Sequence, residues 1–104
     1  MFDNLDAVEK NYEELTKKIS DPEVISNQNE WRKMMKEQSD LEPIVQKYRE
    51  YKNVQKELEE AKEMLNDKEL KELAEEEMLA AKEKLPVLEE ELKMLLIPKD
   101  PDDD

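Results

Sequence analysis

The sequence of 104 residues contains no glycine, no cysteine and no histidine. Phosphate-binding loops, nucleophile elbows and tight hairpin turns all depend on the backbone freedom of glycine, so its absence argues against each of them. Without cysteine and histidine there is no basis for a disulfide, a common zinc site, thiol chemistry or an ordinary general base at neutral pH. We therefore expect that the chain is not an enzyme. We assign it no catalytic, cofactor-binding or metal-ligating residue.

Long apolar runs are also missing. No segment approaches the roughly 20 apolar residues of a membrane span, and the opening Met1-Phe2-Asp3 is not a signal peptide. Apolar residues make up 37% of the chain and charged residues 45%, a balance that suits slender helices sharing a narrow seam. We expect one soluble, cytoplasmic, all-helical domain that does not interact with membranes.

A first helical series covers residues 3–20. Its apolar side chains recur every three or four residues: Phe2, Leu5, Val8, Tyr12, Leu15 and Ile19. Ser20-Asp21-Pro22 should end this helix, and residues 23–27 are expected to form an extended connecting loop. Ser26 or Asn27 can cap the following helix, since the side chains of both accept hydrogen bonds from free amides.

A second series keeps one face for about five heptads. Its members are Trp31, Met34, Gln38, Leu41, Val45, Tyr48, Tyr51, Val54 (or Gln55), Leu58, Ala61 and Leu65. At ~1.5 Å per residue the helix would be roughly 55–60 Å long. Pro43 either opens a new helix capped by Ser39 or Asp40, or kinks a continuous one. The apolar series keeps its phase across Pro43, which favours the kink.

Asn66-Asp67 should form a turn before a third series. The apolar positions of this series are Leu70, Leu73, Ala74, Met78, Ala81, Leu85, Leu88, Leu92 and Leu95. Pro86 is expected to bend this helix, with a break as the alternative. The short turn makes the second and third helices antiparallel, and the first helix can lie along the amino-terminal half of the second. The predicted fold is all-α: an elongated antiparallel three-helix bundle or coiled-coil hairpin with one long kinked central helix.

Charge is distributed unevenly. Residues 1–30 carry 3 basic and 8 acidic side chains, residues 31–56 carry 7 and 4, and residues 57–104 carry 7 and 18. The basic side chains of the central stretch are Arg32, Lys33, Lys36, Lys47, Arg49, Lys52 and Lys56. They either face acidic neighbours across the helical seams or form a docking patch. Trp31, Tyr48 and Tyr51 lie among them but fall on the apolar series, which favours a place in the core.

Two runs of glutamate, residues 75–77 and 89–91, were considered as metal ligands. Consecutive helical residues point about 100° apart, so such a run does not converge on one ion. A solvated face is the better interpretation. Asp100 and residues 102–104 lack the glycine and the distal glutamate of a calcium loop.

The most specific segment is the last one, where Leu95-Leu96 runs into Ile97-Pro98-Lys99-Asp100-Pro101 and then Asp102-Asp103. Two prolines three positions apart cannot continue a helix. The segment resembles the Leu-Leu-Leu-Pro-Lys-Asp-Pro-Asp-Asp junction of the bacterial peptide chain release factor 1 family. Segments that agree in order and spacing are residues 5–12, 20–24, 41–45, 48–51, 60–65 and 69–74. The resemblance covers essentially the whole chain.

The resemblance implies the amino-terminal domain of a factor that directs translation termination at the stop codons UAA and UAG. Residues 1–97 would form this domain, and residues 98–104 would begin the linker to decoding and catalytic domains. The catalytic Gly-Gly-Gln motif of the family cannot lie in a chain without glycine. The implied partner is the ribosome, at the stalk base of the large subunit and mainly through protein, with the GTPase release factor as a further candidate.

The alternative is a free-standing coiled-coil scaffold or a helical chaperone-like protein. Its apolar seams would be buried by self-association, whereas we expect a monomer. Sedimentation distinguishes a dimer of long parallel helices from a monomeric hairpin bundle.

Overall fold

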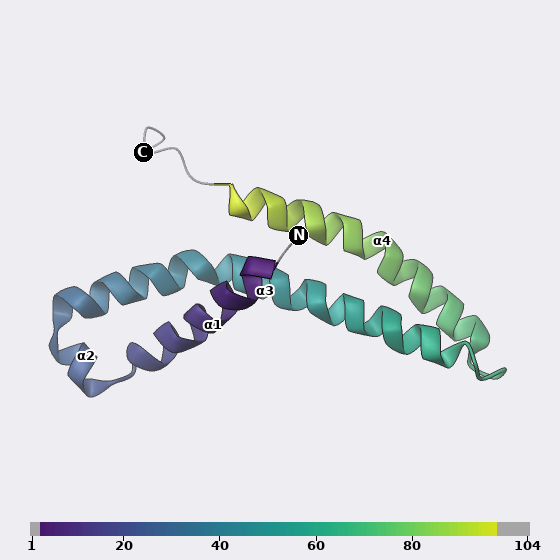
Figure 1. Cartoon of the computed structure of the whole chain (residues 1–104), viewed down its shortest axis with the longest axis horizontal. Coiled ribbons are helices and arrows are strands. Elements are labelled where there is room, and N and C mark those ends of the chain that lie inside the picture. Colours follow the sequence, from purple (N-terminus) through teal and green to yellow (C-terminus); the bar gives the residue numbers. More distant parts are fainter. Residues whose placement is uncertain (1–2, 98–104) are drawn as a thin grey trace. The chain divides into compact units, whose positions relative to one another are not determined.

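The protein is all-α, as the sequence predicts. The computed structural model describes residues 3–97, and Figure 1 shows its four helices. They are α1 (Asp3–Lys18), α2 (Pro22–Ser26), α3 (Gln28–Met64) and α4 (Lys71–Leu96). Residues 3–97 contain no β-strand. The predicted role of Phe2 in the first apolar series and the predicted junction at residues 98–104 both lie outside the described residues.

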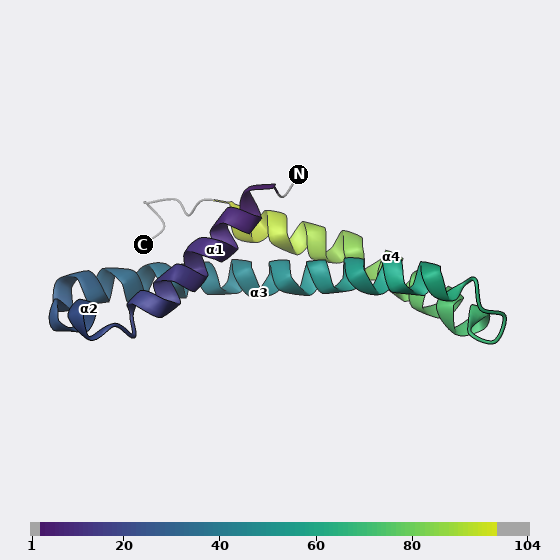
Figure 2. The same ribbon diagram turned by 60° about the horizontal axis from the view of Figure 1, so that its bottom comes forward.

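The chain divides into two compact units, Met1–Gln46 and Lys47–Asp104. Helix α3 is continuous across this division, and Figure 2 shows it as a single helix. It contributes residues 28–46 to the first unit and residues 47–64 to the second.

In the first unit, α1 lies beside the beginning of α3 and runs in the opposite direction. The indole Nε1 of Trp31 donates to the carbonyl of Ile19 at 3.1 Å, and the Nε2 of Gln38 donates to the Oγ1 of Thr16, also at 3.1 Å. Thr16 thus meets the later residue Gln38, and Ile19, just after α1, meets the earlier residue Trp31. This order is the one expected for an antiparallel pair. This confirms the predicted position of the first helix along the amino-terminal half of the long one.

The segment between α1 and α3 corrects the sequence prediction. Residues 23–27 were expected to be extended, but Pro22–Ser26 form the short helix α2. A carboxylate oxygen of Asp21 accepts from the amide of Glu23 at 3.0 Å and caps this helix. Pro22 occupies the first turn, where a missing amide costs nothing and the fixed φ is already helical.

Asn27 ends α2 and begins α3. Its Oδ1 accepts from the amide of Glu30 at 3.4 Å, whereas the hydroxyl of Ser26 donates back to the carbonyl of Glu23. Of the two caps proposed from the sequence, Asn27 is therefore the one that is used.

Pro43 lies inside α3 and does not end it. Leu41 is half-buried, Val45 is 1% exposed and Tyr48 is 7% exposed, so the buried face keeps its phase across the proline. The prediction of one continuous helix is confirmed, and a new helix capped by Ser39 or Asp40 is not formed. The kink itself stays a prediction.

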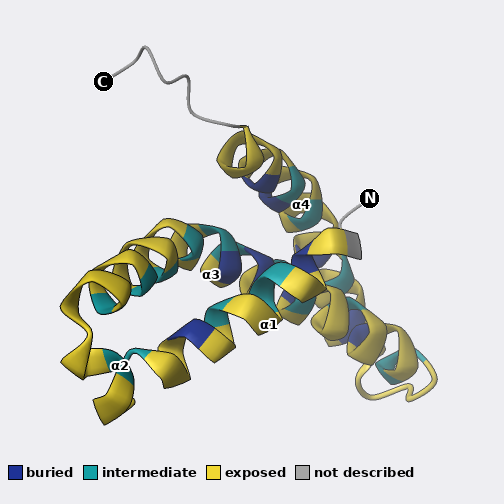
Figure 3. Ribbon diagram, turned by 60° about the vertical axis from the view of Figure 1, so that its left-hand side comes forward, coloured by how far each residue is buried: buried dark blue, intermediate teal, exposed yellow. Residues whose placement is uncertain are grey.

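In the second unit, residues 47–64 of α3 pack against α4. Val54, Ala81 and Leu88 form the centre of the core, with Tyr51, Leu58 and Leu85 packed against them. The sequence left Val54 and Gln55 as alternatives, and the structure buries Val54 and exposes Gln55. Figure 3 shows that the buried positions of α4 fall on one side of the helix.

The turn between α3 and α4 includes Asn66 and Asp67, as predicted. The Oδ1 of Asp67 accepts from the amide of Glu69 at 3.0 Å. Pro86 lies inside α4, so the alternative of a broken helix is wrong. The predicted bend stays a prediction.

Three residues of the apolar series predicted for the last helix do not lie on its buried face. Leu70, Leu73 and Leu95 are exposed by 38%, 47% and 37%. Leu70 precedes the first residue of α4 and Leu95 lies in its last turn. Leu73 is one residue away from the fully buried Ala74, and consecutive helical residues point about 100° apart. Only one of these two neighbours can face the core.

Candidate docking surface

The two glutamate runs, residues 75–77 and 89–91, both lie on α4. Among residues 3–97, no group of three or more carboxylates is arranged to hold an ion. Asp100 and residues 102–104 lie outside this range. Two members of the run at residues 89–91 bind side chains of α3, although Glu90 and Glu91 are exposed. Only part of this run therefore forms the solvated face that the sequence predicts.

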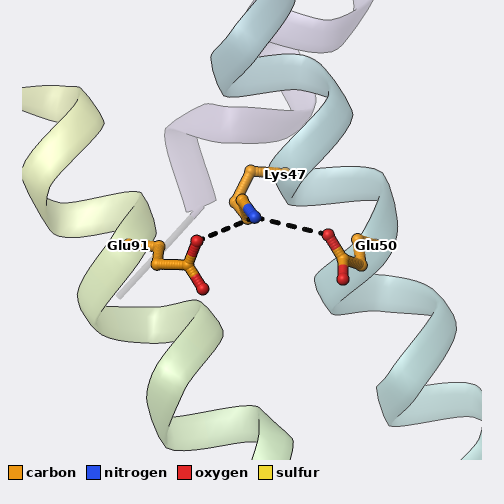
Figure 4. A network of polar contacts seen from close by, with 3 residues as sticks. All are labelled: Lys47, Glu50 and Glu91. Carbon is orange, nitrogen blue, oxygen red and sulfur yellow. Dashed lines mark hydrogen bonds and ion pairs between the residues drawn. The ribbon is translucent and has the colours of Figure 1, made fainter.

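Lys47 links the two helices of the second unit. Its Nζ lies 2.8 Å from the Oε2 of Glu91 on α4 and 3.5 Å from the Oε2 of Glu50 on α3 (Figure 4). The hydrogen bond to Glu91, with the negative charges of Glu50 and Glu91, raises the pKa of Lys47 above its ordinary value of 10.5. The ammonium group therefore stays charged under physiological conditions and bridges the two carboxylates.

Tyr51 makes a second link one turn further along α3. Its hydroxyl donates to the Oε1 of Glu89 at 3.0 Å. Partial burial, followed by the hydrogen bond and charge of Glu89, raises the pKa of Tyr51 above its ordinary value of 10.0. Ionisation of the phenol would remove the donor and place two negative charges side by side.

We expect Glu89→Gln to lower the pKa of Tyr51 toward its ordinary value, because the carboxylate that stabilises the protonated phenol is gone. The titration of the Tyr51 Cζ signal by carbon-13 NMR measures this directly. The raised pKa also contributes stability below about pH 10, and this contribution is lost as the pH rises through the folded-state pKa. A Tyr51 pKa that does not change in Glu89→Gln would contradict the contribution assigned to Glu89.

The basic residues of the central stretch do not act as one group. Lys47 is half-buried between carboxylates, which confirms for this residue the interpretation that basic side chains face acidic partners across the seam. Lys36 pairs with Asp40 at 3.6 Å within the exposed face of α3. The ammonium of Lys52 lies 4.6 Å from the centre of the Tyr48 ring.

The three aromatic side chains of this stretch belong to the interior, as favoured from the sequence. Tyr48 is buried, and Trp31 and Tyr51 are half-buried. The hydrogen bonds of Trp31 to Ile19 and of Tyr51 to Glu89 join α3 to its neighbours. These rings therefore hold helices together and are not an aromatic platform for a ligand.

The exposed basic side chains remain as candidates for docking. In the first unit, Arg32 and Lys36 are four residues apart and share a face of α3, with Lys33 next to Arg32. In the second unit, Lys52 and Lys56 have the same spacing. Lys56 is exposed, like Arg32, Lys33 and Lys36.

Comparison with known proteins identifies the family of the chain. Residues 8–104 match the model described as the PCRF domain. The chain belongs to the PCRF domain family. No helix within residues 3–97 of this PCRF domain combines the length and apolar character that a membrane crossing requires.

The relatives of this PCRF domain carry the name that the resemblance implied. The chain is 51% identical to "Peptide chain release factor 1" of Caldicellulosiruptor saccharolyticus, 55% to that of Clostridium novyi and 53% to that of Alkaliphilus oremlandii. In each case the match covers 100% of this chain and 30% of the relative. The resemblance to the release factor family is thereby confirmed. No solved structure matches the chain.

The contacts of Glu89 and Glu91 were missed from the sequence. Charge runs give no indication of which member points toward a neighbouring helix. The only available signal was position, because Glu89 and Glu91 flank the core residues Leu88 and Leu92 along α4.

Proposed function

We propose that this PCRF domain is the amino-terminal, ribosome-docking domain of a cytoplasmic peptide chain release factor that directs translation termination. Identity of 51–55% over the whole chain to proteins named peptide chain release factor 1 carries the proposal. Action at UAA and UAG follows from the resemblance to the same family. Residues 1–97 would be the docking domain, and residues 98–104 would begin the linker to the domains that read the codon and catalyse hydrolysis.

A docking role also suits the chemistry of the chain. Without glycine it cannot contain Gly-Gly-Gln, and without cysteine or histidine it has neither a thiol nucleophile nor an imidazole general base. Two of its polar contacts, Lys47 with Glu91 and Tyr51 with Glu89, join helices to each other. We therefore propose that the domain performs no reaction and positions a catalytic domain of the same factor.

The net charge of −13 constrains the contact with the ribosome. Most of such a surface repels the RNA backbone, so binding by broad neutralisation of phosphates is unfavourable. We propose that the domain docks at the stalk base of the large subunit mainly through ribosomal protein. Contact with RNA would be confined to the exposed basic residues of α3. The GTPase release factor is a further candidate partner of the same domain.

In a peptide chain release factor that carries this domain, we expect reversal of Lys33, Lys36 and Lys56 to glutamate to weaken ribosome binding by about tenfold. The slope of log affinity against log salt should fall by about one for each phosphate that the variant no longer neutralises. Lys52 is left unchanged because it covers the ring of Tyr48. Equilibrium binding to ribosomes at several salt concentrations measures both quantities.

The matched control reverses Lys10, Lys17 and Lys18, which are exposed on α1. Both variants change the net charge equally, so a general charge effect would weaken binding equally in the two. Unchanged affinity and salt dependence in the α3 variant, with its helical circular dichroism intact, would rule out the basic residues of α3 as a contact surface.

A further inference from the structure

An exposed apolar stripe runs along α4. Leu73, Ala80, Val87 and Met94 recur every seven residues and are all exposed, with 57% exposure for Val87 and 68% for Met94. Helical residues seven apart lie on nearly the same face, with a drift of about 20° per heptad. These four residues are called the α4 stripe below. The seven-residue repeat is the spacing at which one helix receives another.

The middle of the α4 stripe borders a groove between α4 and α3. Its apolar lining comes from Ala80, Val87 and Leu88. Its charged lining comes from three carboxylates and one ammonium, those of Glu50, Glu83, Glu91 and Lys84. Leu88 belongs to the core of the unit, so the floor of this groove is fixed by packing. The groove is therefore a preformed feature of the helix pair.

The charges beside the α4 stripe follow the same repeat. The residues three positions after Leu73, Ala80 and Val87 are Glu76, Glu83 and Glu90. The residues four positions after the same three are Glu77, Lys84 and Glu91. In a helix these positions lie on the same side as the stripe. Five carboxylates and one ammonium thus border the apolar residues. Two of the carboxylates also pair within the chain, Glu90 with Lys93 at 3.6 Å and Glu91 with Lys47 at 2.8 Å.

We propose that the α4 stripe and its groove dock a basic amphipathic helix of a partner protein. The apolar residues of that helix would pack on Ala80, Val87 and Met94, as in other complexes in which a helix occupies a groove. Its lysine and arginine side chains would pair with Glu76 and Glu83, as residues flanking a coiled-coil seam do. This proposal stands apart from the proposed RNA contact, because it concerns residues of α4 instead of the basic residues of α3 and can be tested without ribosomes.

Charge selects this occupant over two others. A second copy of the chain would place its own carboxylates against those of the first, and each copy carries a net charge of −13. A nucleic acid would bring phosphates to the same carboxylates. A helix with basic flanks satisfies both the apolar stripe and its acidic border.

The test uses the full 104-residue chain and a fluorescein-labelled synthetic helix of three heptads, with leucine at the seam and lysine at the flanking positions. A matched peptide has glutamate in place of lysine. Fluorescence anisotropy should show saturable binding of the basic peptide and none of the acidic one. Absence of saturable binding of the basic peptide would overturn the proposal.

We expect Val87→Glu to weaken binding of the basic peptide by at least about tenfold. Attraction between net charges alone predicts the opposite, because the substitution makes the chain more acidic. The control is Leu79→Glu, which adds the same charge at a residue that is 61% exposed and points about 100° away from Ala80. Its binding should stay within about twofold of the unsubstituted chain, since glutamate is a good helix former and the α4 stripe keeps all four of its residues.

Equal loss of binding in the two variants, or tighter binding by Val87→Glu, would overturn the proposal. Sedimentation provides an independent outcome. A dimer of the unsubstituted chain that Val87→Glu converts to a monomer would show that the α4 stripe receives a second copy instead of a basic partner. Urea midpoints of both variants establish that the fold is retained.

Discussion

Replacement of Leu88 by alanine is expected to reduce the free energy of unfolding by about 3 kcal/mol. Leu88 is 4% exposed and forms the centre of the core of the second unit together with Val54 and Ala81. Truncation removes buried methyl groups and leaves a cavity between α3 and α4. Because Ala81 is already small, the neighbouring core residues have little side-chain volume with which to fill that cavity.

Urea denaturation followed by circular dichroism measures this loss. The matched control is Val87→Ala at the adjacent residue, which is 57% exposed and should change the stability by less than about 0.5 kcal/mol. A loss for Leu88→Ala no larger than that for Val87→Ala would contradict the position of Leu88 in the core.

Replacement of Pro86 by alanine is expected to stabilise the protein by about 2 kcal/mol. A proline inside a helix removes one hydrogen bond and crowds the carbonyl four residues earlier, at a cost of about 3 kcal/mol relative to alanine. Pro86 is exposed within the continuous helix α4, so its removal sacrifices no buried contact. The greater freedom of the unfolded chain without proline offsets part of the gain, by about 0.4–1 kcal/mol.

Pro22→Ala is the control for this substitution. Pro22 lies in the first turn of α2, where proline is favourable, so the same replacement should give no gain there. Both free energies are obtained from urea denaturation. A loss of stability in Pro86→Ala would show instead that the packing of α4 on α3 requires the geometry that Pro86 imposes.

The buried face of the long helix was predictable because apolar spacing persists over many turns. The structure buries or half-buries the predicted positions from Trp31 to Leu65, including those on both sides of Pro43. A periodic pattern of this length outweighs the local cost of one proline. The sequence could not decide between Val54 and Gln55. The apolar face of a helix rotates slowly along its length, so either of two neighbouring residues can face the partner helix.

Short elements and single side chains were less predictable. Five residues of α2 are too few to show a period, although Asp21 before Pro22 is a recognisable helix start. Glu89 and Glu91 were interpreted as part of a charge run, yet each meets a partner on α3. The exposure of Leu73 similarly depends on which of two neighbouring residues the packed helix turns inward.

The candidate docking surface was predictable only in part. Composition identified the basic stretch, but the division of its side chains between pairing and exposure depends on the position of α4. Lys47 is paired because Glu91 lies 2.8 Å away, whereas Lys33 and Lys56 are exposed. The sequence prediction did not include the α4 stripe: only Leu73 belongs to the predicted apolar series, and Ala80, Val87 and Met94 lie outside that series.

Competition in a peptide-release assay tests the central claim most directly. Ribosomes carrying peptidyl-tRNA at a UAA codon are treated with a full-length bacterial peptide chain release factor 1, with and without an excess of this folded chain. If the chain is the ribosome-docking domain of such a factor, it should raise the KM of the factor for the ribosome, leave kcat unchanged and release no peptide by itself. Release kinetics that do not change at any excess of the folded chain would contradict the account, and so would peptide release by the chain alone.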